Sequence, residues 1–182
     1  METLAKIIDG HIVHDETRVA VCIKGTRLGF PATLEAISPG WPFGVNYFIE
    51  TEVVAEEPHQ EMGEQFLKLT ILPRVAHGIL AFAARLLLVE AKGQKVGDKR
   101  LEREFIISYN NAEEAHRFCQ YPGIYERLVF LHKQSKFTEM LVKADSGLWM
   151  AQPVNFRALS PDLFRETFAR LADIGQILFE AF

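Results

Sequence analysis

The stretch that decides the fold is GQKVGDKRLEREFIISYNNAEEAHRFCQY, residues 93–121. A tight Gly97-Asp98 turn is expected to lead into a strand over residues 101–109, where apolar residues alternate with polar ones. Asn111, with Glu114 three residues later, is typical of a helix start, because the two side chains can satisfy backbone N–H groups that have no partner inside the helix. The order turn, strand and capped helix specifies architecture and supplies no obvious nucleophile, base or ligand set.

The chain after this stretch carries equally local signals. Pro122 separates a second short helix, expected over 123–134, from the helix before it. A β-hairpin is expected with arms 137–144 and 148–153, joined at Asp145-Ser146-Gly147. A final helix is expected over 161–181, with Ser160 as N-cap and Pro161 at the first position. Its apolar face should cover the sheet and consists of Phe164, Phe168, Leu171, Leu178 and Phe182.

The chain before residue 93 predicts a mostly antiparallel meander and one helix. Strands are expected over 18–24, 33–37, 45–54 and 66–73, with breaks marked by Gly25, Gly29 and Pro31. Residues 3–14 fit a helix turn or a short strand equally well. The window around 76–90 is rich in Ala and Leu, which favours a buried helix. It contains Arg85 and is shorter than the roughly twenty apolar residues that a bilayer span needs.

Together these elements predict an α+β fold. We expect a mostly antiparallel sheet of about six to eight strands, covered mainly on one face by helices that include the C-terminal one. The 182 residues can bury a substantial core, so a single domain over 1–182 is expected. Two packed halves, about 1–75 and 76–182, are the alternative.

Charge and cysteine content limit the possible partners and the compartment. The chain has 20 Lys and Arg against 24 Asp and Glu, a net charge of −4, and no run of four basic residues, so no nucleic-acid partner is expected. Cys22 and Cys119 lie far apart in apolar segments, as expected of buried thiols in a reducing compartment. Because Asp9 and His11 interrupt the early apolar run, no signal peptide is expected. The cytoplasm is the expected location, with peripheral contact at the inner-membrane surface as the alternative.

The Gly97-Asp98 region also resembles a group of uncharacterised bacterial proteins. Val96-Gly97-Asp98, Leu101-Glu102 and the following Phe105-Ile106-Ile107-Ser108 are similar to that group's Val-Gly-Asp-x-x-Phe-Asp-x-x-Phe strand motif. Leu101 stands where the group usually has Phe, and Glu102 where it usually has Asp. The resemblance covers the C-terminal half, from near Leu67. It implies an α+β fold and brings no known activity.

Most candidate chemistry in the sequence has a structural explanation. His11 and His14 are separated by an odd spacing that places them on opposite faces of a strand, and no third ligand is near, so no metal site is expected. No cofactor motif is found either. Asp145-Ser146-Gly147 is expected to be a hairpin loop and not a protease nucleophile region. Glu102 and Glu104 are expected on the solvated face of their strand.

Two functional hypotheses remain from the sequence. The first is a non-catalytic binding or scaffolding module that recognises a protein or an apolar ligand through three aromatic residues. Trp41 and Phe43 lie in the loop 39–44, which two prolines stiffen, and Tyr47 lies just beyond it. In its structural alternative, Trp41 and Phe43 fold back and plug one end of the sheet. The second hypothesis is a small-molecule enzyme with a cleft beside the helix near 76–90, where His77, Arg85 and Asp98 converge. No individual catalytic residue is assigned.

Overall fold

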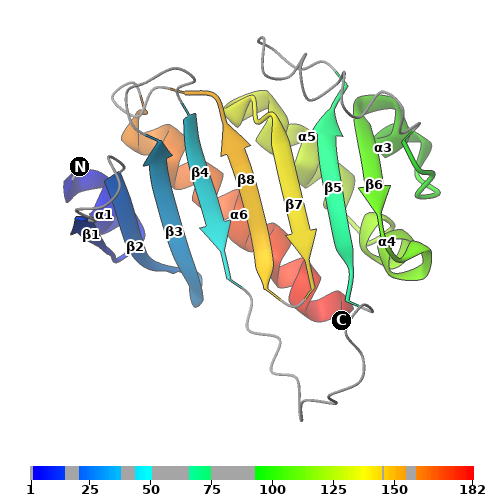
Figure 1. Cartoon of the computed structure of the whole chain (residues 1–182), viewed down its shortest axis with the longest axis horizontal. Helices are drawn as coiled ribbons and strands as arrows, with labels where there is room; N and C mark the ends of the chain where they lie inside the picture. The colour runs from blue at the N-terminus through cyan, green and yellow to red at the C-terminus, as the bar shows by residue number, and fades with distance from the viewer. Residues whose placement is uncertain are drawn as a thin grey trace.

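The computed structural model describes residues 2–14, 21–37, 44–50, 66–74, 93–144, 146–154 and 159–182. Within these ranges the chain forms one eight-stranded antiparallel sheet and five helices, the last of them C-terminal (Figure 1). This confirms the predicted α+β fold.

The sheet combines strands from both parts of the chain. In spatial order the strands are β1 (His11–His14), β2 (Val21–Arg27), β3 (Phe30–Ile37), β4 (Gly44–Ile49), β8 (Gly147–Gln152), β7 (Glu139–Lys143), β5 (Lys68–Pro73) and β6 (Phe105–Tyr109). Every neighbouring pair is antiparallel. Because β5 lies between β6 and β7, strands from before and after residue 75 share one sheet and one core.

The described helices are α1 (Glu2–Ile7), α3 (Lys99–Glu104), α4 (Ala112–Cys119), α5 (Ile124–Ser135) and α6 (Pro161–Ala181). Helices α5 and α6 lie behind the sheet in Figure 1, and α3 and α4 lie at its β6 end. The predicted caps are present: Leu163 donates its backbone N–H to Ser160 Oγ at 3.1 Å, and Glu114 donates its backbone N–H to Asn111 Oδ1 at 3.2 Å. None of the described helices is long and apolar enough to cross a bilayer.

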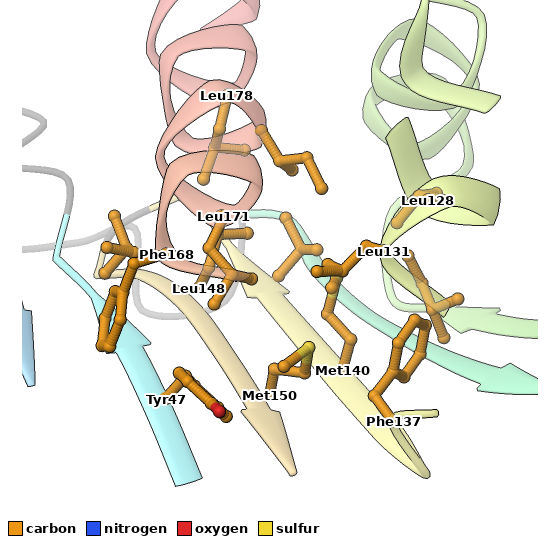
Figure 2. Packing of buried hydrophobic residues seen from close by; sticks show 14 of the residues in the cluster. Tyr47, Leu128, Leu131, Phe137, Met140, Leu148, Met150, Phe168, Leu171 and Leu178 are labelled. Atoms are coloured by element: carbon orange, nitrogen blue, oxygen red, sulfur yellow. The ribbon is translucent and has the colours of Figure 1, made fainter. Parts of the chain in front are cut away.

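The core lies between α6, α5 and the inner face of the sheet. One residue from each strand forms an unbroken row across that face, from β1 to β6: Ile12, Ile23, Leu34, Tyr47, Met150, Met140, Ile71 and Ile107. Figure 2 shows Phe168 and Leu171 of α6 above Tyr47 and Met150 of this row. Since burying one large apolar side chain stabilises by roughly 1.5–3 kcal/mol, this layer is a major source of stability.

The predicted strand over 101–109 is half correct. Residues 99–104 form the helix α3, and the strand β6 begins only at Phe105. Asp98 is the N-cap of α3, accepting backbone N–H groups of Arg100 at 2.7 Å and Leu101 at 3.3 Å. Residues 99–104 form a helix because Lys, Arg, Leu and Glu have high helix propensity. The Asp98 cap also accepts the first backbone N–H groups, which have no partner inside the helix.

Glu102 therefore does not lie on a strand. Its Oε1 accepts the backbone N–H groups of Val96 at 3.0 Å and Gly97 at 3.1 Å, and so holds the turn against the helix that follows it. Glu104, at the end of the same helix, pairs with its neighbour Arg103. The expectation that Glu102 and Glu104 lie on the solvated face of a strand is therefore wrong. Both belong to helix α3, and Glu102 stabilises the turn before it.

The N-terminal part differs from expectation at Pro31 and Gly25. Pro31 does not mark a break but lies inside β3, which begins at Phe30, opposite Thr26 of β2. Strand β2 does not end at Gly25 but continues to Arg27, and the turn comes at Leu28-Gly29, where both residues have positive φ. A Cβ at Gly25 would collide with the carbonyl oxygen of Ile8. Thr26 donates its backbone N–H to that same oxygen at 2.6 Å. Gly25 thus serves a close backbone approach and not a turn.

Residues 3–14, which the sequence left open, form both a helix and a strand, α1 and then β1. Strand β5, the hairpin of β7 and β8, and helices α4, α5 and α6 agree with prediction in position. On the predicted apolar face of α6, Phe164, Phe168, Leu171 and Leu178 are buried, whereas Phe182 is exposed at the end of the chain. The expected helix near 76–90, the loop 39–43 and the extension of β4 over 51–54 lie outside the described residues.

Candidate functional site

The outer face of the sheet carries an apolar centre. Because side chains alternate along a strand, the neighbours of the inner row point to the opposite face. From β2 to β6 they form a second row: Lys24, Thr33, Phe48, Trp149, Leu141, Thr70 and Ser108. Its three central members are large, apolar and half-buried. None of the described helices lies over this face (Figure 1).

A pocket of about 440 Å³ opens in this face beside the turn between β7 and β8. It is lined by Phe48, Ile49, Glu50, Leu141, Lys143, Ser146, Gly147, Leu148 and Trp149. The sheet register explains why it forms there. In the row next to Phe48, Trp149 and Leu141, the middle position is Gly147, so no side chain fills the space over β8. Gly147 has φ 110°, a conformation that glycine adopts without a steric penalty.

The lining separates apolar and charged groups. Phe48, Trp149 and Leu141 supply the apolar surface, and Glu50 and Lys143 stand on the β4 and β7 sides of the pocket. Apolar walls with a few polar groups at defined places are the usual composition of small-molecule sites. The arrangement therefore suits a ligand with an apolar body.

A second lysine lies beside the pocket. Lys68 of β5 is the direct cross-strand partner of Lys143, and both side chains are exposed on the outer face. Within the part of the chain that the structure describes, neither ammonium has an ion-pair partner. Like charges directly opposite each other on a sheet destabilise it, so this edge of the pocket attracts an anion.

Of the predicted aromatic anchors, the structure describes Tyr47. Its side chain is fully buried on the inner face, and its hydroxyl donates to Gln152 Oε1 at 2.6 Å. Burial also raises its pKa well above the ordinary value. Tyr47 therefore has no exposed surface for a partner, and its neighbour Phe48 lines the pocket instead. Trp41 and Phe43 lie outside the described residues.

The predicted enzyme cleft is described only at Asp98. The Arg100 side chain hydrogen-bonds to this carboxylate and holds its pKa below the ordinary value, and the carboxylate also caps α3. A carboxylate with a lowered pKa is a weak general base, so these contacts favour a structural role. His77 and Arg85 lie outside the described residues, so the convergence of the three side chains stays a prediction.

The described residues contain no group of three His, Cys, Asp or Glu side chains that could hold a metal ion. Both His11 and His14 belong to the short strand β1, and the side chain of His11 is exposed. Ser146 and Gly147 lie in the turn of the predicted hairpin, where the backbone N–H of Ser146 donates to the Lys143 carbonyl at 3.4 Å. Asp145 lies outside the described residues.

Sequence reasoning missed the residues that make the pocket, Phe48, Leu141 and Trp149. A signal exists, because each is a large apolar residue at a position where strand alternation predicts a polar one. Tyr47-Phe48 and Leu148-Trp149 are apolar on both faces of their strands. Only the pairing of β4 with β8 and of β8 with β7 brings the three together.

Comparison of the chain with protein-family models, with curated proteins and with solved structures finds no significant match. The resemblance of the Gly97-Asp98 region to a group of uncharacterised bacterial proteins therefore stays a prediction.

Proposed function

We propose that this protein is a non-catalytic binding module that holds the apolar part of a small molecule in the pocket on the outer face of its sheet. The observation that carries the proposal is the row Phe48, Trp149 and Leu141, three apolar side chains on a face that no described helix covers. The volume of about 440 Å³ lies within the range of roughly 300–1,000 Å³ typical of ligand sites.

The concave shape supports a small ligand over a protein partner. A protein interface of standard size involves roughly 20–30 residues on each side, whereas nine of the described residues line this pocket. Binding is also favoured over catalysis because the described carboxylates at the Gly97-Asp98 turn, where the alternative enzyme cleft was expected, are used by the fold. Asp98 caps α3, and Glu102 accepts two backbone N–H groups, so their charge serves the fold.

We place this function in the cytoplasm, with the inner-membrane surface as the alternative. The two cysteines of the chain form no disulfide. Burial raises the pKa of the Cys119 thiol to about 12, so this group is an unreactive core residue. Two cysteines without a disulfide are usual in a reducing compartment.

The proposal is tested with 1-octanol as a neutral apolar probe. The chain has two tryptophans, so the variant Trp41→Phe leaves Trp149, in the pocket wall, as the only tryptophan reporter. Titration with octanol should change the fluorescence emission of Trp149 until the signal saturates. Calorimetry on the unmodified chain should give the same dissociation constant for octanol. Adding Leu141→Asn to the Trp41→Phe variant should weaken octanol binding at least about tenfold, because the substitution removes apolar contact worth roughly 1.5–3 kcal/mol.

The matched control is Ser108→Asn, which changes the same outer row two strands away, beyond the pocket. It should leave octanol binding unchanged. Both variants must first show a cooperative thermal transition. Failure of octanol to bind the unmodified chain, or equal binding by the Leu141→Asn and Ser108→Asn variants, would overturn the proposal.

A further inference from the structure

We infer that the ligand is an anionic amphiphile, one apolar chain with a single carboxylate, whose anionic end lies between Lys68 and Lys143. The inference rests on the proposed function, because it names the ligand class for the same pocket. Its basis is the position of two ammonium groups, neither of which has an ion-pair partner among the described residues, next to an apolar cavity that one of them lines.

The two lysines place like charges opposite each other on the exposed face of the sheet. They are direct cross-strand partners, and both project from the same face, because each lies two residues from a member of the outer row, Thr70 or Leu141. Side chains opposite each other in an antiparallel pair have Cβ atoms only about 4.5–5.5 Å apart. An anion between the two ammonium groups replaces this repulsion with two attractive contacts, each of them a charge-assisted hydrogen bond.

Among the described lining residues, the one other charged side chain sets the direction of the ligand. Glu50 stands at the β4 side, separated from Lys143 by the bare backbone of Gly147. Its carboxylate repels an anion there, so the charged end is directed to the β7–β5 side. The apolar chain then runs over Gly147 toward Phe48 and Trp149. β7 carries one carboxylate on the outer face, Glu139. It lies on the far side of Leu141 from the two lysines, so it does not repel an anion bound between them.

Three probes with the same chain and different ends separate the contributions: octanoate, 1-octanol and octylamine. They are titrated at low ionic strength into the Trp41→Phe variant, with the emission of Trp149 as readout. Octanoate should bind about tenfold tighter than octanol, a difference of ~1.4 kcal/mol. Octylamine should bind more weakly than octanol. The advantage of octanoate should shrink as salt is added, because exposed charges are screened.

Two substitutions assign the effect to the lysine pair. Lys68→Gln and Lys143→Gln should each reduce the ratio of octanoate affinity to octanol affinity, and together they should bring this ratio to about one. Each single variant should be no less stable than the parent, since it removes a like-charge contact. The matched control is Lys24→Gln, an exposed lysine on the same face of β2, outside the pocket, which should change nothing.

The outcomes separate this inference from the proposed function. If octanol binds and octanoate is no tighter, or if its advantage survives the double substitution, the anionic ligand is refuted and the apolar pocket stands. If none of the three probes binds the unmodified chain, the proposed function fails and this inference fails with it.

Discussion

Replacing Phe168 by alanine should lower the free energy of unfolding by about 3–5 kcal/mol. The ring is fully buried between α6 and the sheet. It makes edge contacts with Tyr47 and Phe164, at centroid distances of 5.1 and 4.9 Å. Burial of a Phe side chain contributes roughly 1.5–3 kcal/mol, and each aromatic pair adds about 0.5–1.5 kcal/mol. The better helix propensity of alanine offsets less than about 1 kcal/mol of this loss.

The control is the same substitution on the same helix at Phe179, whose side chain is 53% exposed. It gains the same helix propensity and loses little packing, so its effect should stay within about 0.5 kcal/mol. Both values come from urea unfolding followed by circular dichroism. If Phe168→Ala costs less than about 1 kcal/mol, or no more than Phe179→Ala, then α6 does not dock on the inner row as described.

Three further predictions test individual positions. Gly25→Ala should lower the free energy of unfolding by about 1–3 kcal/mol, measured by thermal or chemical unfolding, because its Cβ meets the Ile8 carbonyl. The control Gly44→Ala should be tolerated, because its Cβ would be 3.5 Å from the nearest described atom. Equal effects of the two substitutions would contradict the close backbone approach at Gly25. Asp98→Ala should cost about 1 kcal/mol through loss of the α3 cap and Asp98→Asn less, and equal losses would show that charge, not capping, matters. Burial raises the pKa of the Glu139 carboxyl above its ordinary value of 4.5. The folded state therefore keeps the carboxyl proton to higher pH than the unfolded state does, so the free energy of unfolding falls as pH rises from 4.5 through the folded pKa. Glu139→Gln should remove that decline and be the more stable protein at neutral pH, and an unchanged pH profile of the unfolding free energy would contradict this.

Local signals made much of the fold predictable. The Ser160-Pro161 start of α6, the Asn111 cap of α4 and the turn between β7 and β8 each depend on residues close in sequence. Prediction failed where two local patterns coincide. Leu101 and Phe105 are four residues apart, a spacing that fits one face of a helix as well as one face of a strand. The cap at Asp98 decides for the helix up to Glu104.

The candidate site was less predictable, because it depends on sheet order. Phe48 lies about a hundred residues before its cross-strand neighbour Trp149, and no local pattern states that β4 pairs with β8. The phase of β4 was also ambiguous from sequence. Tyr47 and Phe48 are both aromatic, and only the packing of α6 decides that the first is core and the second lines the pocket.

The central claim is that an apolar ligand lies on the outer face of the sheet against Trp149. The most direct test is a crystal structure of the unmodified chain soaked with 8-bromo-1-octanol, in which anomalous scattering locates the bromine. We expect one bromine peak and continuous ligand density over Gly147, in van der Waals contact with Trp149 and Leu141. Bromine at another site with this pocket empty, in crystals where no neighbouring molecule covers it, would contradict the account.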